Sequence, residues 1–376
     1  MRSNYLENLI AIAFGITLAA VLLEVFLRIY NPFPTRIKGD KIILPANRKY
    51  VFENIHVAGL DTYIVHTKNA LGFRGEENEA ANFNGRTKVF VVGGSTTECL
   101  YLSDGQDWPN LAGEKIRKSI PGLWLNNAGL DGHSTFGHTL LVQDYLLKLK
   151  PDYIVFLVGT NDVERADLDK FDSMHIRNYS KHRNWKGKLV EHSELANLVH
   201  NFYAVYKAND KNITHFSFKL SQADTFELPA SERQKALAMQ QEFLPKYRQR
   251  IDNLIKICQQ NNIKPVFVTQ PYLLGFGTDA ATGANLARIK IGKRDGATQW
   301  QILQLYNSVT IQACNERNIP VINLADKMPK QSVYFYDQAH FTKAGARKVA
   351  EIVAAELLPY MLAAENAFAN KQNTIL

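Results

Sequence analysis

The sequence has little cysteine, no internal repeat and no low-complexity tract. Its 376 residues include only three cysteines, Cys99, Cys258 and Cys314. An odd, small number excludes a disulfide framework, and no Cys-x-x-Cys or Cys/His spacing predicts a metal site. We therefore expect buried thiols, no metal and no cofactor. Cys99 lies four residues after Ser95, and we interpret it as a packing residue rather than a nucleophile.

The chain also lacks any motif of an RNA- or DNA-binding protein. Its net charge of +8 favours acidic partners such as anionic polymers or membrane surfaces. Without a recognition motif, nucleic acid is not an expected partner. Hydrophobic residues make up 46% and charged residues 21% of the chain, which is ordinary for a globular protein.

One long apolar run lies near the N-terminus. Leu9 to Leu27 contains a single charged residue, Glu24, and about 20 apolar residues span a bilayer as a helix. A cleaved signal peptide and a buried helix are the alternatives. No clear A-x-A cleavage site follows, while Arg28 and two prolines resemble a membrane exit. We predict that residues 1–30 form an uncleaved anchor. Four basic residues follow the span and one precedes it, so the positive-inside rule alone would place the body in the cytoplasm.

Short apolar runs alternate with amphipathic segments over most of the remaining chain. The runs are Lys88–Val92, Trp124–Asn127, Tyr153–Val158, Pro265–Thr269 and Pro320–Leu324. Helices are expected over Phe243–Cys258 and after Gly345. This alternation predicts an α/β fold, in which helices cover both faces of a parallel sheet. We expect an irregular lead-in over 31–85, a catalytic domain over 86–362 and a C-terminal tail over 363–376.

An insertion of roughly 80 residues, at about 163–242, is too long for a simple crossover. It contains a basic, aromatic run with no acid, built from Arg177, Tyr179, Lys181, Arg183, Trp185, Lys186 and Lys188. A solvated face is one interpretation, and a cap that receives an anionic or carbohydrate substrate is the other. The same alternatives apply to the basic cluster at 288–294.

Four polar motifs lie at predicted strand ends or before the last helix. They are Gly93-Gly94-Ser95, "NAGLDGHS" (127–134), "VGTND" (158–162) and "DQAHF" (337–341). Because parallel strands collect ligands at their carboxyl ends, these motifs are expected to meet at one edge of the sheet. Each motif alone is weak, and Ser95-x-x-Glu98 also fits a simple helix-capping box.

Together the motifs supply the parts of a serine hydrolase. A serine hydroxyl needs a base, for which His340 is the candidate, and the base needs an orienting carboxylate, for which Asp337 is the candidate. An oxyanion needs preset donors, and the backbone N–H groups of Ser95 and Gly132 and the Asn161 amide are candidates. His133 and His138 are interpreted as satisfied histidines, and Asp162 as a loop-orienting residue.

The combination resembles the SGNH hydrolases, also called the GDSL lipase/esterase superfamily, over about residues 86–360. The order Ser…Asp-x-x-His argues against the α/β-hydrolase fold. The resemblance implies a three-layer, flavodoxin-like α/β/α sheet of order 2-1-3-4-5, and the apolar run adds the predicted N-terminal transmembrane helix. It implies Ser95 as nucleophile, Gly132 and Asn161 as oxyanion donors, and Asp337 and His340 as the remaining triad. The family's Gly-Asp-Ser is Gly-Gly-Ser here, with Gly94 in place of the aspartate.

These features predict an enzyme that acts on ester bonds. The first hypothesis is a serine esterase that removes acyl groups, acetyl above all, from a carbohydrate or envelope polysaccharide. An O-acyltransferase with a sugar hydroxyl as acceptor would use the same triad. A non-catalytic carbohydrate-binding module is the third alternative. The expected partners are the ester substrate and the membrane, and the resemblance favours a catalytic domain outside the cytoplasm.

Overall fold

The computed structural model describes residues 2–30, 37–38, 41–42, 44–54, 57–77, 85–165, 189, 192–199, 202 and 220–373. The chain divides into two compact units, each described by itself below. One comprises Met1–Pro45 and Asp167–Thr214, and the other comprises Ala46–Ala166 and His215–Leu376. All five residues predicted for the catalytic site belong to the second unit.

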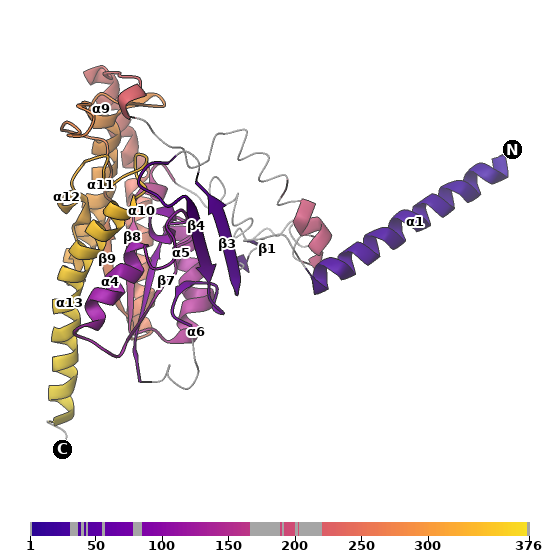
Figure 1. The fold of residues 1–376 in the computed structure, drawn as a ribbon, viewed down its shortest axis with the longest axis horizontal. Helices are drawn as coiled ribbons and strands as arrows, with labels where there is room; N and C mark the ends of the chain where they lie inside the picture. The colour runs from indigo at the N-terminus through magenta and orange to yellow at the C-terminus, as the bar shows by residue number, and fades with distance from the viewer. Residues whose placement is uncertain are drawn as a thin grey trace. The chain divides into compact units, whose positions relative to one another are not determined.

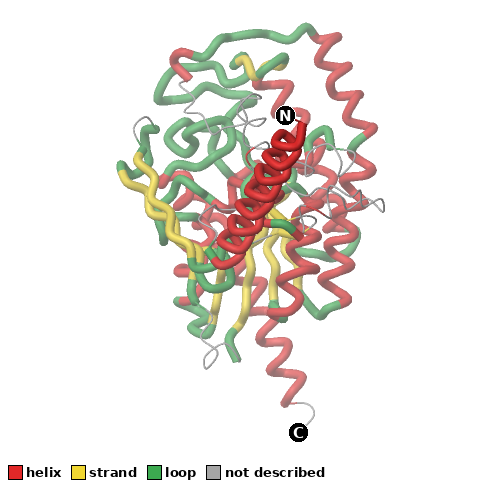
Figure 2. The backbone as a smooth tube through the Cα atoms, turned by 90° about the vertical axis from the view of Figure 1, so that its right-hand side faces the viewer, coloured by secondary structure: helices red, strands yellow, loops and turns green. Residues whose placement is uncertain are grey.

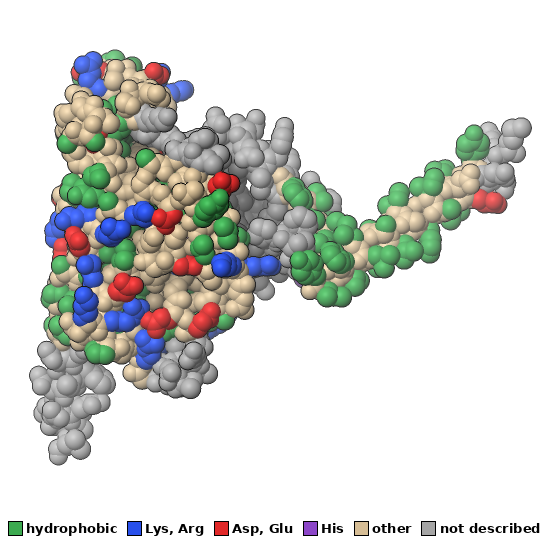
Figure 3. Space-filling view, viewed as in Figure 1, with side chains coloured by type: hydrophobic (Ala, Val, Ile, Leu, Met, Phe, Trp, Pro, Cys, Tyr) green, Lys and Arg blue, Asp and Glu red, His purple; other side chains and the backbone are tan. Residues whose placement is uncertain are grey.

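The first unit begins with helix α1 (Arg2–Ile29). Its Tyr5–Ile29 portion is long and apolar enough to cross a membrane, and none of its most apolar window is buried in the protein. Figure 3 shows hydrophobic side chains along this helix. A membrane span and an N-terminal signal sequence both fit the length and composition of this helix. Two short strands, β1 (Ile37–Lys38) and β2 (Lys41–Ile42), pair after it.

The second unit is built on a six-stranded sheet in the order β12-β9-β8-β6-β7-β5, of which Figure 1 labels β7, β8 and β9. Five strands are parallel: β6 (Thr87–Gly93), β7 (Leu123–Asn127), β8 (Tyr153–Val158), β9 (Lys264–Thr269) and β12 (Val321–Ile322). Numbered along the chain, these five follow the order 2-1-3-4-5, which confirms the predicted fold. The sixth strand, β5 (Arg74–Gly75), pairs antiparallel with β7 at the edge.

The parallel strands form because their apolar runs can be buried on both faces. Every residue of β7 and β8 is buried, and β6 and β9 are buried over their last five residues. Four expected strands match the observed ones within one residue at each end, and β12 is shorter than the expected Pro320–Leu324.

Helices cover both faces of the sheet (Figure 2). Helices α4 (Trp108–Arg117) and α13 (Lys343–Asn373) pack against each other on one face, and α5 (Thr135–Leu141), α10 (Leu244–Gln260) and α11 (Gly296–Asn315) pack on the other. The apolar face predicted for α10 is buried, including Cys258. Shorter elements are α3 (Ser95–Glu98), η1 (Val142–Leu146), α6 (Leu147–Leu149), η2 (Thr160–Asp162), η5 (Leu220–Gln222), α9 (Ala230–Ala238), η6 (Met239–Glu242), β10 (Lys290–Ile291), β11 (Arg294–Asp295) and α12 (Leu324–Lys327).

The lead-in expected to be irregular contains regular structure. Strands β3 (Arg48–Glu53) and β4 (Tyr63–Lys68) form an antiparallel hairpin, and β5 joins the central sheet. Asn54, Gly59, Asn69 and Gly72 fall in the turns between these strands, which is why composition alone missed the strands. At the other end, α13 continues to Asn373, past the boundary predicted at 362, because Ala-rich sequence there favours helix.

The predicted insertion divides between the two units. Its last part, with α9 and η6, belongs to the second unit, where α9 packs on α11. The basic run at 177–188 lies outside the described residues. In the second basic cluster, Arg288 pairs with Glu227 and Arg294 pairs with Glu164, so two of its charges are matched by neighbouring carboxylates.

Candidate active site

Ser95 lies at the first turn after the central strand β6. Gly94 is the N-cap of α3, its backbone is extended, and no side chain caps the helix. The capping-box interpretation of Ser95 is therefore wrong. The Ser95 side chain instead points to a histidine from the other end of the domain, with Oγ 2.7 Å from His340 Nε2. Ser95 is 8% exposed, so the short helix presents a hydroxyl that is shielded from most of the solvent.

His340 is held by the loop that precedes α13. Its Nδ1 lies 2.6 Å from Asp337 Oδ2, and Asp337 Oδ1 accepts the backbone N–H groups of Ala339 and His340 at 2.8 and 2.7 Å. The Tyr336 ring stacks on the imidazole, with ring centroids 5.5 Å apart and planes 12° apart. The contact of Nδ1 with Asp337 and the stacking of Tyr336 on the ring face together fix the orientation of the imidazole.

The surroundings of Asp337 keep it ionised. Burial alone would raise its pKa, but the nearby His340 and the hydrogen bonds from residues 339 and 340 outweigh burial and lower it. A carboxylate only accepts hydrogen bonds, so Nδ1 of His340 carries the proton in this network. Nε2 then offers its lone pair to the Ser95 hydroxyl, which is the arrangement that a general base requires.

Asn161 reaches the same turn from the end of β8. It lies in η2, and its Nδ2 donates to the backbone oxygen of His133 at 3.0 Å. The neighbouring Asp162 is buried and accepts hydrogen bonds from the N–H and hydroxyl of Thr135, and it pairs with Arg250 at 3.3 Å. These contacts agree with the interpretation of Asp162 as a residue that orients the loop.

Gly132 lies in a tight turn between β7 and α5. Its φ of +75° is one that glycine adopts without strain, and the N–H of His133 closes the turn on Leu130 at 3.1 Å. The loop packs directly on the turn that carries Ser95, because Leu130 N–H donates to the Gly93 oxygen and a Cβ on Gly129 would lie 2.3 Å from the Glu98 nitrogen. The structure thus brings Ser95, Asp337 and His340 into hydrogen-bond contact, with Asn161 and the Gly132 loop packed beside them.

Burial keeps His138 and the three cysteines in their neutral forms. His138 is buried, and burial lowers its pKa to about 4, so the ring is neutral. Burial raises the pKa of the Cys99 thiol, whose Sγ donates to the Thr96 oxygen. Burial also raises the pKa values of Cys258 and Cys314 to about 12. All three cysteines are free and buried, as expected.

Comparison with known proteins now identifies the family. The GDSL-like Lipase/Acylhydrolase family matches residues 91–348, well over half of the chain and the whole of the site. The chain belongs to this family. Membership makes it a serine hydrolase of the GDSL type, acting on ester bonds. No relative among curated proteins matches the sequence.

Several solved structures are similar over most of the chain. The acetyl xylan esterase AlAXEase is 15% identical, with a TM-score of 0.41 over 71% of this chain and 98% of that one. An acetylxylan esterase from Geobacillus stearothermophilus is 13% identical, with a TM-score of 0.41 over 72% and 94%. An alpha/beta hydrolase from the metagenome of Lake Arreo, Spain, is 13% identical, with a TM-score of 0.41 over 73% and 96%.

The GDSL signature departs from its name at Gly94, and the structure gives a physical reason. A Cβ built on Gly94 would lie 2.2 Å from Asn161 Nδ2 and 3.1 Å from the His133 oxygen. Gly94 therefore leaves the space in which the Asn161 amide lies. In this GDSL hydrolase, an aspartate at position 94 would compete with Asn161 for that space.

Sequence reasoning missed three residues that shape this GDSL site. Tyr336 stacks on His340, and Glu98, in the helix that begins at Ser95, forms a buried ion pair with Lys68 at 2.9 Å. Tyr336 adjoins Asp337 in the sequence, which was an available signal. Lys68 lies 30 residues before Glu98, and no local pattern connects the two.

Proposed function

We propose that Ser95, His340 and Asp337 form the catalytic triad of an esterase that removes acyl groups, acetyl above all, from a carbohydrate. The observation that carries the proposal is the 2.7 Å contact between Ser95 Oγ and His340 Nε2, completed by the 2.6 Å contact between His340 Nδ1 and Asp337. His340 takes the hydroxyl proton as Ser95 Oγ bonds to the ester carbonyl carbon, and the carbonyl π electrons move onto oxygen. The proton then passes to the departing sugar alkoxide, and a water repeats the sequence to release the acid.

The developing oxyanion needs donors preset at its position. The backbone N–H groups of Ser95 and Gly132 and the side chain of Asn161 are the proposed donors. An amide nitrogen carries two hydrogens, so Asn161 Nδ2 has one for the His133 oxygen at 3.0 Å and one for the substrate. Gly94 allows this placement because it has no Cβ.

A carbohydrate substrate is supported by aromatic rings that lead away from His340. Tyr336 stacks on His340, Tyr101 meets Tyr336 with centroids 6.5 Å apart, and Phe52 of the β3–β4 hairpin meets Tyr101 at 5.7 Å. All three rings are partly exposed. Aromatic faces pack well against the apolar faces of sugar rings. The basic run at 177–188 would add attraction for an anionic polymer.

Product analysis tests the reaction. With an acetyl donor and an oligosaccharide acceptor, the account predicts free acetate as the main product, abolished by Ser95→Ala. Acetylated oligosaccharide in excess of acetate would establish acyl transfer instead. Turnover confined to long-chain lipid esters would contradict both.

Substitutions at two neighbouring positions of β3 test whether the aromatic rings of Phe52, Tyr101 and Tyr336 bind a carbohydrate. Phe52→Ala should raise KM for an acetylated oligosaccharide by roughly 2- to 10-fold, from about 0.5–1.5 kcal/mol for an aromatic contact. The same variant should leave p-nitrophenyl acetate hydrolysis unchanged. Val51→Ala, on the opposite side of β3 and 61% exposed, is the matched control. Equal KM values for Phe52→Ala and wild type would remove this support for a carbohydrate.

The N-terminal helix is proposed to be a retained anchor rather than a cleaved signal. Glu24, the acid within the apolar run, accepts the hydroxyl of Ser193 at 2.8 Å and the backbone N–H groups of Glu194 and Leu195 at 3.0 Å each. It also pairs with Arg28 at 2.9 Å. Cleavage would remove the acceptor that these groups share, so the contacts favour a mature chain that keeps residues 1–30.

Two measurements test the location. N-terminal sequencing of the membrane-bound protein should recover the start of α1, and a mature N-terminus beyond residue 30 would exclude an anchor. We place the catalytic domain outside the cytoplasm, where an envelope polysaccharide lies. Protease added to cells with a permeabilised outer layer should then digest it, and protection until lysis would place it inside.

A further inference from the structure

Glu98 connects the nucleophile turn to the loop that carries Gly132. It lies at the end of α3, three residues after Ser95, and its side chain is 3% exposed. Its two carboxylate oxygens have different contacts. Oε1 lies 2.9 Å from Lys68 Nζ, and Oε2 accepts the backbone N–H of Asp131 at 2.7 Å. Asp131 directly precedes Gly132, so this hydrogen bond holds the peptide next to a proposed oxyanion donor.

The lead-in supplies the charges that allow a carboxylate to be buried here. Lys68, at the end of β4, is 2% exposed and faces Glu98. Arg74 of β5 lies 3.7 Å from buried Asp107, so two buried cations face two buried anions. A buried carboxylate without such a partner would be strongly destabilising or would take up a proton.

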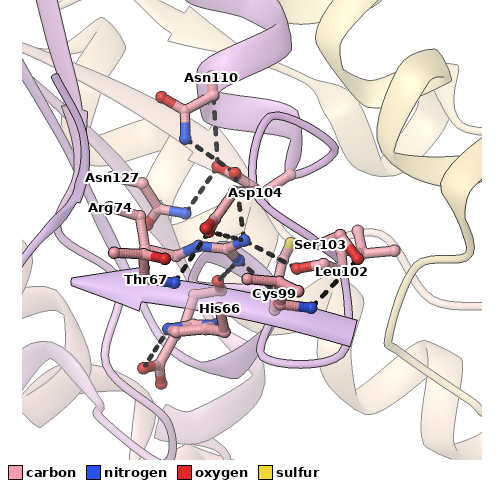
Figure 4. Close-up of polar contacts among 12 residues, drawn as sticks. His66, Thr67, Arg74, Cys99, Leu102, Ser103, Asp104, Asn110 and Asn127 are labelled. Carbon is pink, nitrogen blue, oxygen red and sulfur yellow. Dashed lines mark hydrogen bonds and ion pairs between the residues drawn. The ribbon is translucent and has the colours of Figure 1, made fainter. Parts of the chain in front are cut away.

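Arg74 also fixes the far end of the nucleophile helix. Its guanidinium donates to the backbone oxygens of Glu98 and Cys99 at 2.8 Å each and of Leu102 at 2.7 Å. Figure 4 shows Arg74 directed at Cys99, Leu102 and Asp104. These oxygens include ones that a helix end leaves without an internal partner. Helix α3 is thus held by the lead-in, through Arg74 at its backbone and Lys68 at its last side chain.

We propose that Glu98, neutralised by Lys68, is a positioning residue for the oxyanion site, which makes the segment 46–77 a working part of the active site. The proposal rests on the proposed triad and its donors. Glycine has broad conformational freedom, so Gly132 alone does not fix the direction of its N–H. The hydrogen bond from Asp131 to Glu98 removes that freedom on the N-terminal side of the turn.

Two double variants separate the hydrogen bond from the charge pair. The acceptor-keeping variant combines Lys68→Met with Glu98→Gln, which removes both charges but keeps an oxygen that can accept the Asp131 N–H. The acceptor-free variant combines Lys68→Met with Glu98→Met, which removes the charges and the acceptor at similar volume. Replacing a buried ion pair by apolar residues of similar size is often neutral for stability, so both full-length proteins in detergent should melt at similar temperatures.

The expected difference is in turnover. A shift of about 1 Å in a catalytic group costs on the order of 100-fold, so the acceptor-free variant should have a kcat for p-nitrophenyl acetate 10- to 100-fold below that of the acceptor-keeping variant, with KM within about twofold. Equal kcat values in the two proteins would overturn the proposal.

If the acceptor-free variant does not fold, Glu98→Asp tests the hydrogen bond to Asp131 instead. It keeps the charge facing Lys68 but shortens the reach toward Asp131 by one methylene, and kcat should fall about 10-fold. Wild-type kcat in Glu98→Asp would then overturn the proposal. Ser95→Ala, assayed in parallel, distinguishes failure of the Glu98 proposal from failure of the proposed triad. Activity in Ser95→Ala would refute the triad, whatever the Glu98 variants show.

Discussion

Replacing Gly94 with alanine removes no functional atom, yet we expect it to disable the proposed oxyanion site. The added Cβ would lie 2.2 Å from Asn161 Nδ2. Ordinary contacts between heavy atoms are about 3.5–4.0 Å, so the amide must move by more than about 1 Å. Because Nδ2 is at the end of a rotatable side chain, the amide can swing aside at little cost in stability. The backbone at Gly94 is extended, with φ −86° and ψ −151°, and has the negative φ that L residues favour.

The expected loss is that of one oxyanion donor. Removing such a donor costs about 10²–10³ in kcat, so Gly94→Ala should lower kcat about 100-fold, or about 2.7 kcal/mol in activation free energy. KM and the melting temperature should change little. Gly122→Ala is the matched control, because a Cβ there meets no atom within 4 Å.

The assay is hydrolysis of p-nitrophenyl acetate by the full-length protein in detergent, with Asn161→Ala and the double variant measured beside it. If Gly94→Ala acts through Asn161, it has little further effect once Asn161 is replaced by alanine. Wild-type kcat in Gly94→Ala would refute the reasoning. So would a 100-fold loss that persists undiminished in the Asn161→Ala background.

Three further predictions follow from the same contacts. Asn161→Ala should lower kcat by about 100- to 1000-fold with little change in KM; a rise in KM alone would make Asn161 a substrate-binding residue. Asp337→Asn should lower kcat by about 10⁴-fold, because an amide no longer selects the imidazole tautomer with the proton on Nδ1; a loss below tenfold would contradict that role. Burial is the main cause that lowers the pKa of His138 to about 4 and of His66 to about 2, so both rings are neutral in the folded chain. The unfolded chain binds protons below about pH 6.5, so stability is full above that pH and falls below it by ~1.4 kcal/mol per pH unit for each histidine. Denaturant titrations should show a loss of about 4 kcal/mol between pH 7 and pH 5, and no loss would contradict the buried, neutral state.

The sheet was predictable from the sequence because its strands are buried on both faces. A strand such as Tyr153–Val158 must then be apolar throughout, which leaves a continuous run that can be read directly. Its order came from the family resemblance, since apolar runs do not say which strands are neighbours. The motifs of the site were readable for a related reason, because three of them follow a strand end within a few residues and the fourth, at 337–341, directly precedes the last helix.

What the sequence did not reveal depends on contacts between distant segments. The β3–β4 hairpin carries mixed polar and apolar residues, and its role is apparent only when Lys68 meets Glu98 across 30 positions. The Ser-x-x-Glu pattern pointed to a capping box, but the side chains of Ser95 and Glu98 contact distant residues instead of capping the helix. Ser95 contacts His340, 245 residues away, and Glu98 contacts Lys68 and Asp131.

The most direct test of the account is covalent labelling of Ser95. A fluorophosphonate reacts with an activated serine, because the serine oxygen bonds to phosphorus as fluoride leaves. The full-length protein should take up one probe, and mass spectrometry of its peptides should place the added mass on Ser95. Labelling should disappear in Ser95→Ala and slow by several orders of magnitude in His340→Ala. Equal labelling of wild type and Ser95→Ala, or an adduct on another residue, would contradict the central claim.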